Sequence, residues 1–133
     1  MAVGVQPICP CKTNASPALI VNTANTNTNG TGTITTVLTA GKQGARIVRI
    51  LLKATGVTTA GMLRIFVKVS AGTYRIVGEV AVAAVPTPGA STPTWEGVWT
   101  PSGGPLELDP DCVLGISTHN AEEFTALANA GDY

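Results

Sequence analysis

The stretch ARIVRILLKA, residues 45–54, decides the fold class of this chain. Val48, Ile50 and Leu52 alternate with a mixed set of residues, so an extended strand here has one wholly apolar face. The segments MLRIFVKVS (62–70) and YRIVGEVAVAAV (74–85) repeat this period of two, and the links are too short for a parallel crossover. We therefore predict an antiparallel meander of three strands. The residues that carry the alternation in its second and third strands are Leu63, Ile65, Val67, Val69, Tyr74, Ile76, Gly78, Val80 and Val82.

Weaker strand patterns continue on both sides of this meander. They are ALIVNT (18–23), GTITTVLTA (32–40), TWEGVWT (94–100), CVLGISTH (112–119) and EEFTALANA (122–130), the last of which we interpret as a strand and not a short helix. Residues typical of turns dominate the links at 55–59, 70–73, 86–93 and 101–111. We expect an all-β fold, an antiparallel β-sandwich of about eight strands over residues 31–133 with a jelly roll as its expected form, and an extended N-terminal arm over residues 1–30.

Length and charge narrow the class of protein. A chain of 133 residues suffices for one domain with its own core. Eight Lys and Arg balance eight Asp and Glu, and charged residues make up only 12% of the chain. Because nucleic acids and acidic membranes attract surplus positive charge, we expect no nucleic acid and no membrane as a partner.

The neutral total conceals a division along the chain. All Lys and Arg lie between residues 12 and 75, and all Asp and Glu lie between residues 79 and 132. If the two halves formed different sheets or ends, neighbouring subunits would meet with complementary faces. We then expect an assembly that is weakened by salt and by charge reversal at Arg49 or Arg64.

The N-terminal sequence and the cysteines bear on the compartment. No stretch approaches the roughly 20 apolar residues of a membrane span. The start, MAVGVQPICPCK, lacks the pattern of a secretory signal peptide, so we expect synthesis in the cytoplasm. The odd number of cysteines, Cys9, Cys11 and Cys112, favours reduced thiols, although a bridge from Cys9 or Cys11 to Cys112 stays open.

The chemistry-bearing residues do not form a recognisable active site. His119 with Ser117 and Asp132 suggests a hydrolase triad, but no G-x-S-x-G elbow presents a nucleophile. Asp109 and Asp111 are interpreted as parts of a polar turn in preference to a calcium site. We therefore predict that the protein is not an enzyme and uses no cofactor and no metal.

Two further groups of residues are candidates for binding. Trp95 and Trp99 lie on one strand face, where they form either a platform for stacking a sugar or part of the core, and we favour the core. A basic sheet face is predicted either to be solvated or to contact another protein. Its members are Arg46, Arg49, Lys53, Arg64, Lys68 and Arg75.

Two segments of the chain resemble small virion structural proteins of tailed bacteriophages. They are GARIVRILLKATGVTTAGMLRIFVKVSAGTYRIVGEVAV (44–82) and LGISTHNAEEFTALANAGDY (114–133). The T-G-x-T-T-A-G link, the L-R-I-F strand and the C-terminal S-T-H-N-A-E-x-F with G-D-Y carry the resemblance.

The resemblance implies a jelly-roll capsid decoration or cement protein on the exterior of the virion, made in the host cytoplasm. Such a protein binds the major capsid protein as a homo-oligomer, with a trimer as the expected form. The alternative is a tail or head-fibre component that binds host glycans through Trp95 and Trp99. Expected contacts with the capsid or between subunits are the arm together with Arg46, Arg49, Lys53, Arg64, Lys68, Asp132 and Tyr133.

Overall fold

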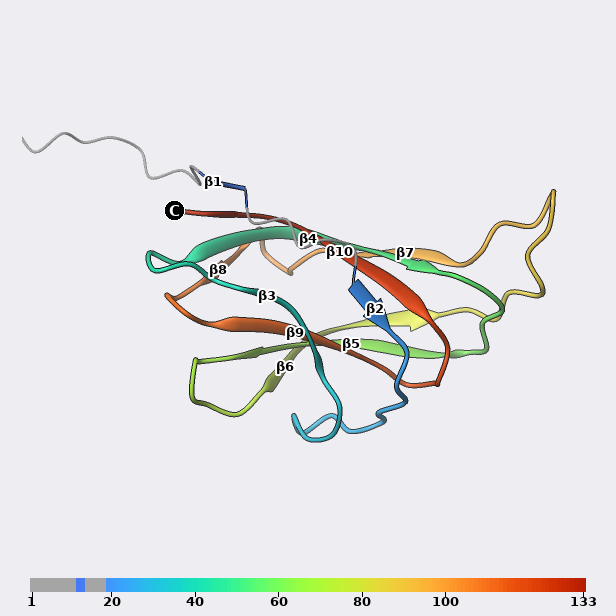
Figure 1. Cartoon of the computed structure of the whole chain (residues 1–133), viewed down its shortest axis with the longest axis horizontal. Coiled ribbons are helices and arrows are strands. Elements are labelled where there is room, and N and C mark those ends of the chain that lie inside the picture. The colour runs from blue at the N-terminus through green and yellow to red at the C-terminus, as the bar shows by residue number, and fades with distance from the viewer. Residues whose placement is uncertain (1–11, 14–18) are drawn as a thin grey trace, which may run out of the picture.

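Two antiparallel sheets packed face to face make up the computed structural model, which describes residues 12–13 and 19–133 (Figure 1). Sheet A contains β1 (Lys12–Thr13), β2 (Leu19–Val21), β4 (Ala45–Ala54), β7 (Glu96–Trp99), β8 (Leu106–Leu108) and β10 (Phe124–Asp132). Sheet B contains β3 (Thr35–Thr39), β5 (Gly61–Lys68), β6 (Arg75–Val82) and β9 (Val113–Thr118). The predicted all-β sandwich is confirmed.

The strand order is that of a jelly roll. Sheet A runs β2-β10-β4-β7, and sheet B runs β3-β9-β5-β6. β1 and β2 follow one another along one edge of β10, and β8 and β7 do the same along the far edge of β4. Both sheets are therefore four strands wide, and most successive strands cross from one sheet to the other, as in two Greek keys. β8 was not predicted, because it lies in the turn-rich stretch 101–111. β1 was not predicted either, and it lies within the predicted arm.

The predicted three-stranded meander is wrong in one respect. β5 and β6 form the expected hairpin, with Leu63 opposite Val80, but β4 belongs to the other sheet. Burying the two apolar faces against each other removes more surface from water than placing the strands side by side in one sheet. The link between β4 and β5 is fixed by Thr58, whose hydroxyl donates to Ala83 O at 2.8 Å and accepts from Val85 N at 3.1 Å.

A β-bulge in β4 changes which of its residues face the core. In β10, Asn129 pairs with Arg49 and the next residue, Ala130, pairs with Ile47, so Val48 is the extra residue. Val48 is 44% exposed, whereas both Ile47 and Ile50 are fully buried. The prediction that Val48 lies on the inner face is therefore wrong, because the bulge shifts the alternation by one residue.

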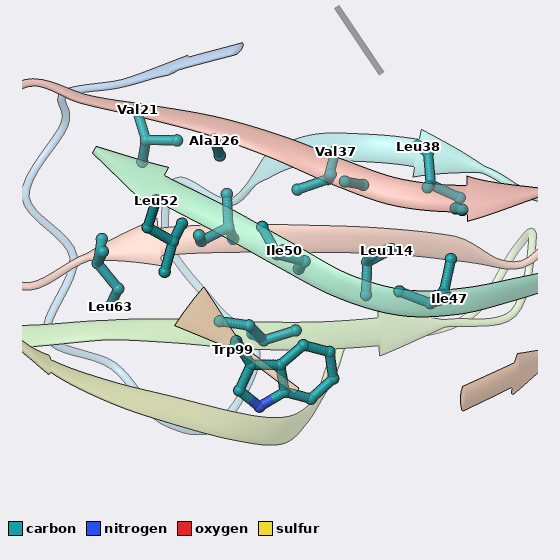
Figure 2. Packing of buried hydrophobic residues seen from close by; sticks show 14 of the residues in the cluster. Val21, Val37, Leu38, Ile47, Ile50, Leu52, Leu63, Trp99, Leu114 and Ala126 are labelled. Atoms are coloured by element: carbon teal, nitrogen blue, oxygen red, sulfur yellow. The ribbon is translucent and has the colours of Figure 1, made fainter. Parts of the chain in front are cut away.

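The core fills the space between the sheets. Figure 2 shows side chains from β4, β5, β9 and β10 and from the strands beside them pointing into this space. Large buried members include Ile47, Ile50, Leu52, Leu63, Ile65, Leu114, Ile116 and Phe124. The core thus consists of aliphatic side chains from both sheets, with a few aromatic rings.

A smaller buried cluster lies on the outer face of sheet B. Phe66 is fully buried there and contacts Tyr74 edge to face, with ring centroids 6.3 Å apart. Gly115, which pairs with Phe66, leaves room for the rings: a Cβ on it would lie 2.6 Å from Ile34 Cγ2 and 2.9 Å from Tyr74 Cε1. The Asn/Thr-rich segment 22–34 therefore packs over this face.

Asn25 holds the segment 22–34 in place. Its backbone N–H donates to Thr118 O at 2.8 Å, and its side-chain amide donates to Thr31 O at 3.0 Å and Thr33 O at 2.9 Å. Its Oδ1 accepts from Asn27 N at 3.0 Å. Since Val21 and Asn25 are buried, the described part of the predicted arm from residue 19 onward belongs to the sandwich. Residues 1–11 and 14–18 of the arm lie outside the described residues.

Candidate interaction surface

The outer face of sheet A carries an apolar row across three strands. Leu51 on β4 pairs with Leu127 on β10 and with Val98 on β7. Leu51 is 37% exposed and Val98 is 48% exposed. Directly opposed side chains in a sheet contact one another, so the three form a continuous strip. Ile20 and Val48 add further exposed apolar surface nearby. A strip of this kind on an otherwise polar face is typical of a contact surface.

Charged pairs lie on both sides of the apolar row. Lys53 on β4 is opposite Glu96 on β7, and Arg46 on β4 is opposite Glu107 on β8. The Arg46 Nε–Glu107 Oε1 distance is 2.7 Å, and Lys53 Nζ donates to Thr94 O at 3.2 Å. Arg49, between the apolar row and Arg46, is exposed. The face therefore combines an apolar centre with charged borders.

The C-terminus completes one of these borders. Tyr133 Oη donates to Glu107 Oε2 at 2.5 Å, and the Arg46 guanidinium lies 5.9 Å from the centre of the Tyr133 ring. The hydrogen bond from Tyr133, and after it the interaction with Arg46, hold the pKa of Glu107 below its ordinary value. The same hydrogen bond raises the pKa of Tyr133, because the carboxylate favours the protonated phenol. Arg46 and Tyr133, two predicted contact residues, are thus brought together around Glu107.

The predicted single basic face does not exist. Arg46, Arg49 and Lys53 lie on the outer face of sheet A, whereas Arg64 and Lys68 lie on the outer face of sheet B. The two groups point in opposite directions because β4 and β5 belong to different sheets. The prediction followed from placing both strands in one sheet.

Arg64 and Lys68 are also engaged within the chain. Arg64 is only 9% exposed, and its Nε lies 2.9 Å from Glu79 Oε1. Its Nη1 lies 3.3 Å from His119 Nδ1, which has to be the acceptor because a guanidinium offers only donors. The Lys68 ammonium group lies 4.7 Å from the centre of the Tyr74 ring. Charge reversal at Arg64 would consequently disturb the fold of one subunit.

The charge division along the chain is not a division in space. Arg46 pairs with Glu107 and Arg64 with Glu79, so cations from the first half meet carboxylates from the second half within one subunit. Asp132, another predicted contact residue, accepts a hydrogen bond from Gly41 N at 3.2 Å. The expectation that the halves form faces of opposite sign is therefore wrong.

Trp95 and Trp99 lie in the core and not on an exposed platform. Their exposed fractions are 9% and 7%. The Trp95 ring meets Phe124 edge to face at 5.8 Å between centroids, and Trp99 points into the core in Figure 2. Our interpretation of these residues as core is confirmed, and they are not available for stacking on a sugar.

The residues of the imagined hydrolase triad are not brought together. Ser117 is buried, and its Oγ has no hydrogen-bond partner among the described residues. His119 contacts Arg64, and Asp132 lies on β10 in the other sheet. Asp109 and Asp111 form a turn in which Cys112 N donates to Asp109 O at 3.2 Å.

Within residues 12–13 and 19–133, we find no metal site and no helix that could span a membrane. No three His, Cys, Asp or Glu side chains of this part gather as a metal site would require. No helix in it has the length and apolar character needed to cross a bilayer. Cys112 is buried with a free thiol, and Cys9 and Cys11 lie outside the described residues.

The apolar row and the carboxylates beside it were not predicted from the sequence. A signal was present, since Leu51 interrupts the charged positions on the mixed face of residues 45–54. The contribution of Val98, Glu96 and Glu107 depends on the pairing of β7 and β8 with β4. No protein-family model matches this chain, and no curated protein matches it in sequence.

Proposed function

We propose that this chain is a bacteriophage virion structural protein, a capsid decoration protein that binds the outer surface of the major capsid protein lattice and stabilises the head. One observation carries the proposal. The two segments that resemble phage virion proteins, residues 44–82 and 114–133, supply both central strands of each sheet, namely β4, β10, β5 and β9. They therefore supply the framework of a jelly roll, an architecture that viral capsid domains use.

The geometry suits a protein that acts by contact. A sandwich with a filled core presents broad, rigid strand faces, and a ligand that binds only the assembled shell stabilises it by mass action. Arg49 and Lys53 are exposed cations that fit acidic groups on another protein. Binding across two neighbouring capsomers would oppose their separation.

The proposal is tested on purified particles. Mass spectrometry should find the protein in heads at a copy number that is a simple fraction of that of the major capsid protein. Cryo-electron microscopy should place a β-sandwich of this size on the outer shell. Absence from heads, or only a few copies per particle, would contradict the proposal.

The alternative, a fibre component that binds glycans, loses its structural support. It depended on Trp95 and Trp99, and both indoles are buried in the core. Replacing either one should therefore impair folding, which a glycan array read together with circular dichroism would separate from a loss of binding.

A further inference from the structure

The outer face of sheet A carries two columns of opposite charge. Along β4, the outward side chains include Arg46, Arg49 and Lys53. Along the neighbouring strands β7 and β8, they include Glu96 and Glu107. The apolar row with Leu51 on β4 and Val98 on β7 lies between the two charged rows. Each row thus joins a residue on β4 to its electrostatic or apolar complement on the edge strands.

We propose that this face binds the same face of a second copy of the chain, about a two-fold axis that lies between β4 and the β7–β8 edge and runs parallel to the strands. Such an axis exchanges the two columns but keeps the rows at the same height. It therefore places Lys53 opposite Glu96 of the second copy and Leu51 opposite Val98 of the second copy. In the last row, Arg46 meets Glu107 of the second copy. Every contact occurs twice, as in any isologous interface.

The charge pattern selects this orientation over the other face-to-face arrangement. A two-fold axis that ran across the strands would keep the columns and reverse the rows. Arg46 would then lie opposite Lys53 of the second copy, and Glu96 would lie opposite Glu107 of the second copy. Like charges across an interface cost several kcal/mol, so the same residues that favour the first arrangement exclude the second.

The pairs within one subunit leave capacity for this contact. The Arg46 and Glu107 side chains are still 39% and 51% exposed although they are paired. A carboxylate accepts several hydrogen bonds, and a guanidinium has five donors, so each partner can serve both its own subunit and a second copy. The Leu51–Val98 row would be removed from water by the same contact, which supplies an apolar centre inside a charged border.

The size of the face indicates how strong the association is. Two strand columns, each about 4.8 Å wide, give the face a width of roughly 10 Å. β4 has ten residues with a rise of about 3.3 Å each, which gives a length of roughly 33 Å. At about 330 Å² per subunit, such an interface is smaller than a standard specific interface and has the size of a weak, transient contact. We therefore expect a concentration-dependent dimer that high salt weakens. This inference does not depend on binding to a capsid. The trimer implied by the resemblance would need a different, head-to-tail contact.

Two variants with opposite charge changes test the arrangement. In K53E, positions 53 and 96 both carry carboxylates, so the K53E homodimer brings like charges together at both copies of this contact. In E96K, both positions carry ammonium groups, and its homodimer is repelled in the same way. When the two variants are mixed, each contact joins a carboxylate to an ammonium group. A change confined to one subunit cannot produce this rescue.

Sedimentation velocity at rising protein concentration gives the dissociation constant, and native mass spectrometry of one isotopically labelled variant identifies mixed dimers. We expect each variant alone to bind itself at least tenfold more weakly than the original chain, and the equimolar mixture to form mixed dimers. Leu51→Thr should weaken the dimer without changing the circular dichroism spectrum. Lys42→Glu, an exposed change in the link between β3 and β4, is the matched control and should leave it unchanged.

Three results would overturn the inference. They are a chain that stays monomeric at every concentration, an oligomer that Leu51→Thr leaves unchanged, and charge variants whose mixture associates no better than each variant alone. Binding of Leu51→Thr to capsids is read out separately, because this variant keeps Arg49 and Lys53. Failure of the dimer and failure of the proposed function are therefore distinguishable.

Discussion

The indole of Trp99 lies directly against Gly78, so that a Cβ on Gly78 would come within 2.1 Å of Trp99 Nε1 and 2.6 Å of Cε2. Gly78 is on β6 in sheet B, and Trp99 is on β7 in sheet A. This contact joins the two sheets where β6 and β7 approach each other. The absence of a side chain at Gly78 makes room for one of the two indoles of the core.

Gly78→Ala should therefore destabilise the protein by about 1–3 kcal/mol, the usual cost of overpacking a core. The midpoint of urea unfolding measures the change. Gly56→Ala is the matched control, because a Cβ at Gly56 meets no atom within 4 Å among the described residues and its backbone is not in the left-handed region. Equal midpoints for the two variants would contradict the packing argument.

Asn25→Ala should destabilise the protein by about 1–3 kcal/mol, because Thr31 O and Thr33 O lose their donor. Hydrogen exchange should accelerate first in residues 25–34, which cover Phe66 and Tyr74. Thr28→Ala, in the same segment but exposed, should have little effect. Unchanged exchange in Asn25→Ala would show that another contact fixes this segment.

Two adjacent buried hydroxyl groups should respond differently to removal. Ser117 Oγ has no partner within the described part of the chain, so Ser117→Ala should change stability by less than about 0.5 kcal/mol or increase it. Thr118 Oγ1 donates to Asn120 O at 2.9 Å, so Thr118→Val should cost about 1 kcal/mol. Thermal unfolding of both variants checks the difference, and a larger loss for Ser117→Ala would reveal an unseen partner of its hydroxyl group.

The contact between Tyr133 and Glu107 should depend on pH in two directions. The pKa of Glu107 is lowered in the folded chain. Its contribution to stability is therefore present above the pKa of Glu107 in the unfolded chain, and it is lost as the pH falls through the pKa in the folded chain. The pKa of Tyr133 is raised, so its contribution is present below its ordinary pKa of about 10 and is lost as the pH rises through the folded value. The C-terminus should thus be held most firmly between these limits.

Ultraviolet titration of the tyrosines tests this behaviour. Glu107→Gln should return the pKa of Tyr133 toward its ordinary value, because the carboxylate that favours the protonated phenol is gone. Glu96→Gln, on the same face but at the other charged border, should leave it unchanged. A Tyr133 pKa that does not respond to Glu107→Gln would contradict the hydrogen bond.

The sequence by itself determined most of the strands and the class of fold. Alternation in residues 45–54, 62–70 and 74–85 marked β4, β5 and β6, and the burial of Leu52, Leu63 and Ile65 follows the same alternation. Val69, which the alternation places on the same inner face, lies beyond the end of β5 and is 61% exposed, so the prediction is wrong there. Alternation with a period of two residues indicates which residues share a face of a strand. This local property needs no knowledge of the partner strands. The sandwich followed from the number of short strands and the turns between them.

Only the tertiary structure decided which sheet each strand joins. The side chains of a strand alternate in the same way in either sheet, so the pattern could not show that β4 and β5 have their outer faces on opposite sides. Arg49 and Arg64 therefore came to lie on different surfaces. The bulge at Val48 depends on hydrogen bonding to β10, about 80 residues away in the chain. The apolar and charged rows of sheet A depend in the same way on pairing between distant strands, which no local pattern specifies.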